Sequence, residues 1–99
     1  MHWAVKVERN LETTMHYLEL AARSESRVVL FPEANLTSYY FPYVVDLADS
    51  EIQRALDQVA AAAKQYGIWT ICGTIRKAAD GRFLNLAHVI SPETGTVVY

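Results

Sequence analysis

Glu33 is the residue of this sequence whose setting most clearly suggests chemistry. It follows the apolar stretch 28–32 (VVLFP), and the seven residues after it carry no charge. A carboxylate at the carboxyl end of a buried strand lies where open α/β sheets place their sites. Apolar neighbours raise the pKa of a carboxyl by desolvating the anion, and that tuning suits a general base near pH 7. The alternative interpretation is a loop carboxylate that caps nearby backbone amides.

Two tyrosines, Tyr39 and Tyr40, are candidates for the wall of a substrate pocket beside that carboxylate. They belong to a connection that runs to Asp49, which is long for a compact domain, and loops of this length are often functional. Packing of the loop on its own side chains is the alternative. Asp46 or Asp49 could also pair with Glu33 in acid–base chemistry, although both are more simply explained by the helix that follows.

The other residues that carry chemistry have structural explanations. Cys72 is the only cysteine, which excludes an internal disulfide, and an apolar strand around it predicts a core thiol with a raised pKa. His2, His16 and His88 lack the spacing of metal ligands, and the four glycines form no phosphate-binding loop. The sequence therefore predicts no metal and no cofactor.

Size and composition restrict the class of protein. The 99 residues are 52% hydrophobic and 20% charged, which indicates one globular domain over residues 1–99. The net charge of −2 comes without the clustered Lys and Arg that nucleic-acid binding needs. No apolar run approaches the roughly 20 residues that span a bilayer, and no signal peptide follows Met1. We therefore expect a cytoplasmic protein with no nucleic-acid or membrane partner.

Periodicity predicts two helices, each with one apolar stripe. Residues 10–23 have Asn10 as a plausible N-cap, and residues 50–66 begin with a capping box of Ser50 and Gln53. The stripe of the first helix consists of Leu11, Met15, Leu18 and Ala22, and that of the second consists of Ile52, Leu56, Val59, Ala63 and Tyr66.

Apolar segments between turn signals predict the strands. These strands cover residues 28–31, 68–75, 84–90 and 96–99. The first is apolar without alternation, which indicates a strand that is covered on both faces. Helices that alternate with strands favour α/β layers.

Several short motifs, taken in order, resemble those of the carbon–nitrogen hydrolase, or nitrilase, superfamily. They are residues 10–12 (family NLE), 28–33 (VVFPE), 36–39 (LTGY), 73–75 (GS), 85–87 (NTA) and 90–95 (DP-x-G). Ser38 replaces the usual glycine, which permits a positive φ that serine resists. The motifs cover almost the whole chain, and their order and spacing carry the resemblance.

The resemblance implies a partial αββα sandwich of the nitrilase type, with helices packed on a mixed sheet. It also implies a Glu-Lys-Cys triad that acts on small-molecule amides or nitriles: the thiolate attacks, and the glutamate takes the thiol proton and later activates water. By position, Glu33 matches the glutamate and Tyr39 matches a tyrosine near the substrate pocket. Cys72 does not match the nucleophile, and the lysine and cysteine are expected after Tyr99.

We therefore interpret the chain as an N-terminal fragment of a carbon–nitrogen hydrolase. It should be inactive by itself, because covalent catalysis needs the base and the nucleophile together. The alternative hypothesis is a non-catalytic α/β module for binding or assembly. Apolar strand faces and an unpaired sheet edge favour association, so we expect a homo-oligomer.

Overall fold

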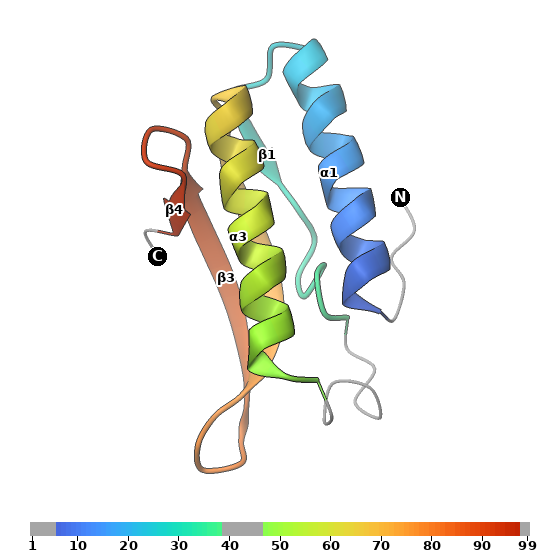
Figure 1. Cartoon of the computed structure of the whole chain (residues 1–99), viewed down its shortest axis with the longest axis vertical. Helices are drawn as coiled ribbons and strands as arrows, with labels where there is room; N and C mark the ends of the chain where they lie inside the picture. Colours follow the sequence, from blue (N-terminus) through green and yellow to red (C-terminus); the bar gives the residue numbers. More distant parts are fainter. Residues whose placement is uncertain (1–5, 39–46, 98–99) are drawn as a thin grey trace.

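In the computed structural model, residues 6–38 and 47–97 are described, and two helices in them lie on one face of a four-stranded sheet (Figure 1). The elements are α1 (Val7–Arg23), β1 (Val28–Leu30), α3 (Asp49–Tyr66), β2 (Trp69–Lys77), β3 (Phe83–Ser91) and β4 (Thr96–Val97). The strands lie in the order β1-β2-β3-β4, with β1 parallel to β2 and the other pairs antiparallel. Helices packed on a mixed sheet confirm the predicted fold class.

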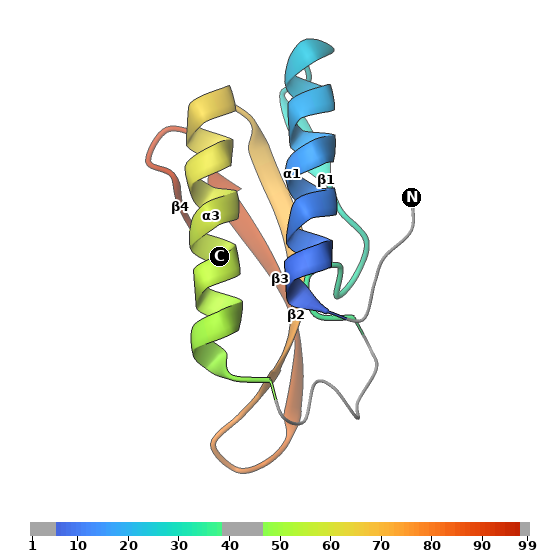
Figure 2. The ribbon, with the colours of Figure 1, turned by 45° about the vertical axis from the view of Figure 1, so that its right-hand side comes forward.

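The two helices bury their predicted stripes against the sheet and against each other. Leu18 of α1 and Val59 of α3 are fully buried, and both belong to one core cluster with Cys72 of β2 and Ile90 of β3. Burial of one such side chain contributes about 1.5–3 kcal/mol relative to exposure. Figure 2 shows the helices side by side over the strands, so the core is a single layer between helices and sheet.

The helix starts differ from the prediction. α1 begins three residues before Asn10, which is therefore inside the helix, where its side chain is fully buried. Ala48 occupies the N-cap position of α3, and Gln53 donates to Asp57 within that helix, so the predicted capping box is absent. The Asn10 prediction failed because a local pattern does not show the tertiary partner, here the carbonyl of Leu36, that competes for a polar side chain. Gln53 instead bonds to a residue of its own helix.

The face of the sheet opposite the helices is open among the described residues. Val28 is 57% and Leu30 is 72% exposed, and Trp69, the register partner of Val28, is 40% exposed. The prediction that the first strand is covered on both faces is therefore wrong for these residues. Side chains of a strand alternate between faces, and Val29 turns toward the core while its two neighbours do not.

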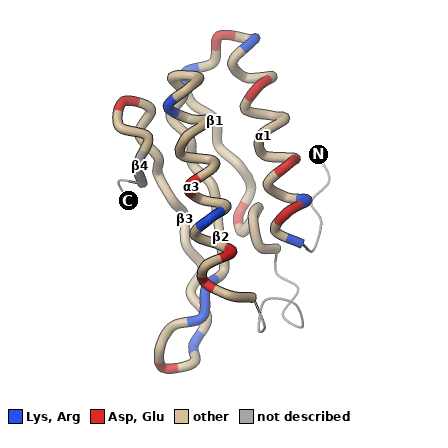
Figure 3. The backbone as a smooth tube through the Cα atoms, in the orientation of Figure 1, with Lys and Arg blue, Asp and Glu red and all other residues tan. Residues whose placement is uncertain are grey.

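Charged side chains are dispersed over the helices and the β2–β3 hairpin (Figure 3). Neither α1 nor α3 combines the length and the apolar character that a bilayer crossing needs.

Candidate active site

Glu33 lies in a turn directly after β1, at the strand end that the sequence predicts. The N–H of Phe31 donates to the carbonyl of Ile71 at 2.9 Å, and the last paired residues of the parallel ladder are Leu30 and Ile71. Residues 33–37 then form the turn, and Glu33 itself is exposed to solvent. The desolvation by apolar neighbours that the sequence analysis expected for this carboxylate is therefore not found in the structure.

The side chains of Asn35 and Thr37 fasten this turn to β2. The N–H of Gly73 donates to Asn35 Oδ1 at 2.7 Å, and the N–H of Ile75 donates to Thr37 Oγ1, also at 2.7 Å. The N–H of Leu36 donates to the carbonyl of Gly73 at 3.1 Å. These bonds satisfy the polar backbone of β2 beyond the point where β1 stops.

The same turn is also fastened to α1. Asn35 Nδ2 donates to Thr14 Oγ1 at 3.1 Å, and the Thr14 hydroxyl donates to the carbonyl of Asn10 at 2.8 Å. Asn10 Nδ2 donates to the carbonyl of Leu36 at 3.1 Å. None of these side chains is more than 2% exposed, so a lost partner would leave a buried polar group without water to replace it.

Gly73 lets the turn come close to β2. A Cβ at this position would lie 2.5 Å from the backbone nitrogen of Ala34, a distance that no side chain tolerates. Ala34 and Ser38 both have positive φ, at 54° and 67°, which costs roughly 1 kcal/mol each for residues with a Cβ. Ser38 thus adopts the conformation for which the family's glycine is suited, and the surrounding hydrogen bonds hold it there.

A groove of about 500 Å³ lies beside Glu33 on the open face of the sheet. Strand ends and strand centres contribute its walls, among them Leu30, Glu33, Ile71, Gly73, Asn85 and Ala87. Its floor is apolar, and its rim carries one carboxylate and one carboxamide. This combination of apolar lining and a few polar groups is typical of small-molecule sites.

The polar groups of the rim contact each other, because Asn85 Nδ2 donates a hydrogen bond to Glu33 Oε1. Asn85 lies opposite Ile75 in the ladder between β2 and β3, and the Thr37 side chain holds the turn at that same residue. A donor to a carboxylate stabilises its ionised form, whereas burial would favour the neutral form. The described residues therefore give the exposed Glu33 carboxylate a hydrogen-bond donor, and they do not bury it.

Cys72 touches the groove but is a core residue, as the sequence predicted. It is 1% exposed, and burial raises the pKa of its thiol to about 12, so the reactive thiolate is negligible near neutrality. On β3, His88 shares a 2.8 Å hydrogen bond with Thr74 Oγ1, and burial, with a smaller contribution from Arg76, lowers the pKa of this histidine. No three potential ligand side chains within residues 6–38 and 47–97 gather as a metal site.

The remaining predicted site residues are not brought to Glu33. Tyr39, Tyr40 and Asp46 lie outside the described residues. Asp49 is the first residue of α3, and its carboxylate lies 3.9 Å from Arg76 Nε, away from the groove. The structure therefore gives no support to acid–base pairing of Asp49 with Glu33.

Sequence reasoning missed the residues that hold the turn. Asn10 and Thr14 fall eight and four residues before Leu18, on the same helical stripe. Two polar residues in a buried stripe signal a tertiary hydrogen-bond network, since burial of such groups requires partners.

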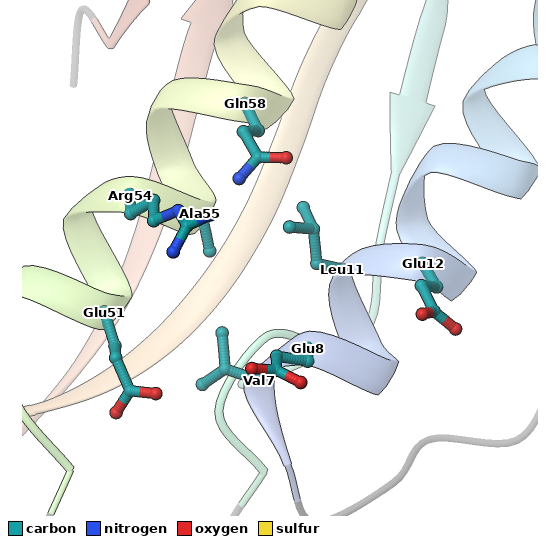
Figure 4. Close-up of a pocket in the computed structure, with 8 residues that line it drawn as sticks. All are labelled: Val7, Glu8, Leu11, Glu12, Glu51, Arg54, Ala55 and Gln58. Carbon is teal, nitrogen blue, oxygen red and sulfur yellow. The ribbon is translucent and has the colours of Figure 1, made fainter.

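A second hollow, of about 330 Å³, lies between α1 and α3 (Figure 4). Glu8, Glu12, Glu51 and Arg54 surround it, with Leu11 among its apolar residues. None of the predicted site residues lines it, so the groove at Glu33 is the candidate active site.

Comparison with known proteins decides the family. A sequence profile of the family described as Carbon-nitrogen hydrolase matches residues 1–98. The chain belongs to the carbon–nitrogen hydrolase family. The match includes the segments around Glu33 and Asn85 and confirms the family that the sequence analysis inferred.

The relatives are longer proteins. The chain is 32% identical over 92 residues to the omega-amidase NIT2-B of Xenopus laevis, which covers 90% of the chain and 32% of that relative. The carbon–nitrogen hydrolase of Helicobacter pylori G27 superposes with a TM-score of 0.82 at 22% identity, over 99% of this chain and 35% of that one. An amidase of Nesterenkonia sp. AN1 gives 0.84 at 14% identity, over 100% and 39%. At such identities the two structures show the fold alone, and the chain spans about a third of the length of its curated relative.

We predict that Thr14→Ala destabilises the fold more than Thr13→Ala. Both threonines donate to the carbonyl four residues earlier, but only Thr14 also accepts the Asn35 amide in a buried site. Loss of that acceptor should cost about 1–3 kcal/mol of unfolding free energy, against about 0.5 kcal/mol or less for Thr13→Ala. Urea denaturation of the two variants checks this, and equal costs would show that the network does not hold the turn.

Proposed function

We propose that Glu33 is the general base of a carbon–nitrogen hydrolase site that acts on small-molecule amides or nitriles. The chain would be the N-terminal portion of that enzyme and supply one wall of its active site. The observation that carries the proposal is the Glu33 carboxylate, anchored through its turn at the rim of an apolar groove and bonded to Asn85. Family membership supports the reaction class.

The proposed nucleophile is a thiol from outside residues 1–99, because Cys72, the only cysteine here, is buried and protonated. Glu33 would take the proton of that thiol as the sulfur attacks the substrate carbon, and would return it to the departing nitrogen of an amide. It would then deprotonate the water that hydrolyses the thioester. A lysine, also from outside these residues, would stabilise the charge that develops on the substrate.

Tyr39 and Tyr40 complete the proposal as substrate-pocket residues, since they follow the anchored turn closely in sequence. A cytoplasmic location is part of the same proposal, because a thiol nucleophile needs a compartment that keeps it reduced. The Nesterenkonia amidase uses such a group: in one of its structures, acrylamide has undergone Michael addition at the active-site cysteine.

We expect the isolated 99-residue chain to hydrolyse no short amide or nitrile. In the native protein that carries this chain, Glu33→Gln should lower kcat/KM by roughly 10²–10⁴-fold, the usual contribution of a general base. Glu93→Gln, an exposed carboxylate in the turn before β4, is the matched control and should leave the rate unchanged. If Glu33→Gln retained the wild-type kcat/KM, Glu33 could not be the general base.

A non-catalytic assembly module is the second candidate function, and the open face of the sheet favours it. The face carries Val28, Leu30 and Trp69, each at least 40% exposed, and an apolar surface of this kind favours association. A homo-oligomer formed through this face is the corresponding proposal for the isolated chain.

We predict that Leu30→Asp reduces self-association of the chain, measured by light scattering across a concentration series. Leu30 is 72% exposed on the open face, so a charge there should disturb the contact without unfolding the protein. Leu20→Asp is the control, since Leu20 is 40% exposed on α1, an element of the helical layer. A wild-type chain that stays monomeric at high concentration would contradict this assembly.

A further inference from the structure

We propose that Asn85 is a positioning residue that holds the Glu33 carboxylate, in its ionised form, at the rim of the groove. The inference rests on the proposed function, in which Glu33 is the base. It concerns a residue on a different strand, 52 positions away in sequence, whose side chain reaches the carboxylate directly.

Two separate parts of the structure set the distance between these side chains. The position of Asn85 is fixed by the antiparallel ladder, in which Ile75 faces Asn85 and Gly73 faces Ala87. The position of Glu33 is fixed by the turn, which is bonded to the N–H groups of the same two β2 residues through Asn35 and Thr37. Strand β2 is thus the common frame, and the contact needs no movement of either element.

The residue type at position 85 has no structural explanation in the core. Asparagine is depleted in strands, and Asn85 is the third residue of β3, with its side chain exposed on the groove face. It neither fills the interior nor caps a backbone group in the described hydrogen bonds. Its described contact is the hydrogen bond to Glu33.

A carboxamide suits this position better than a charged donor would. Its N–H stabilises a carboxylate anion, which is the form that can accept a proton from a thiol. Lys or Arg would stabilise the anion more strongly and weaken it as a base, whereas the amide carries no charge and does not titrate. We therefore propose that the Asn85 carboxamide keeps Glu33 ionised and oriented while Glu33 remains basic enough to accept a proton.

Glu33 and Cys72 are the titratable groups in the described lining of the groove. With a pKa of about 12, Cys72 stays protonated throughout the range in which a carboxyl titrates. Cys72 therefore adds no change of charge to the groove while Glu33 titrates, and a control substitution on β3 is needed to assign a change in the Glu33 titration to Asn85.

The experiment is an NMR titration of the ¹³C-labelled Glu33 carboxyl in the 99-residue chain, with Glu33→Gln used to assign the signal. In Asn85→Leu, which keeps the branched shape of the side chain but removes the donor, the titration midpoint should move to higher pH than in the wild type. Asn85→Asp adds a like charge and should move it at least as far. The control Leu84→Ala changes the neighbouring residue on the same strand, 41% exposed, and should leave the midpoint in place.

The native protein provides a second readout. In Asn85→Leu the acid limb of the profile of kcat/KM against pH should shift to higher pH. Activity that this variant loses at low pH should therefore return as the pH rises. A defect of the fold alone would instead lower kcat/KM at every pH. The positioning role would be overturned if substitution of Asn85 changed neither the titration midpoint of Glu33 nor the acid limb of the kcat/KM profile. Full activity of Glu33→Gln would instead overturn the proposed base, so the two failures are distinguishable.

Discussion

The structure around Glu33 depends on two hydrogen bonds in which N–H groups of β2 donate to side-chain oxygens and not to the backbone carbonyls of a neighbouring strand. Strand β1 ends early, and Asn35 Oδ1 and Thr37 Oγ1 accept the N–H groups of Gly73 and Ile75 in its place. If β1 continued, residues 33–37 would run extended along β2. Side-chain acceptors let the backbone turn instead, and the missing Cβ of Gly73 gives the turn the space that it needs.

Several properties of the site follow from that turn. It carries Glu33 to the exposed side of the sheet, where the carboxylate meets Asn85 at the rim of a groove. At this place the acid is exposed to solvent and accepts a hydrogen bond from Asn85. The buried Asn10 and Thr14 connect the same turn to α1, so hydrogen bonds through Leu36 and Asn35 join the helical layer to the groove.

Periodic features of the fold could be read from the sequence. The stripe containing Leu18 and the one containing Val59 mark both helices, because burial of one face imposes a period on the chain. The sequence also predicted that Glu33 lies at a strand end, because the apolar residues 28–31 are followed by Pro32. The role of Asn10 was not, because its partner, the carbonyl of Leu36, lies 26 residues away, and a local pattern suggested an N-cap instead. The burial of Glu33 was misjudged because the apolar neighbour Leu30 lies with it at the groove on the open face, where both side chains are exposed.

Native-state hydrogen exchange of the Gly73 and Ile75 amides tests the anchoring of the turn most directly. If Asn35 and Thr37 hold these N–H groups in a buried network, both should exchange as slowly as the β2 amides that are bonded to β3. The amide of Arg82 is the reference, since it also donates to a side-chain oxygen, that of Asp80, but in an exposed turn. Exchange of Gly73 and Ile75 as fast as that of Arg82 would show that the turn is not anchored and that Glu33 is not held at the groove.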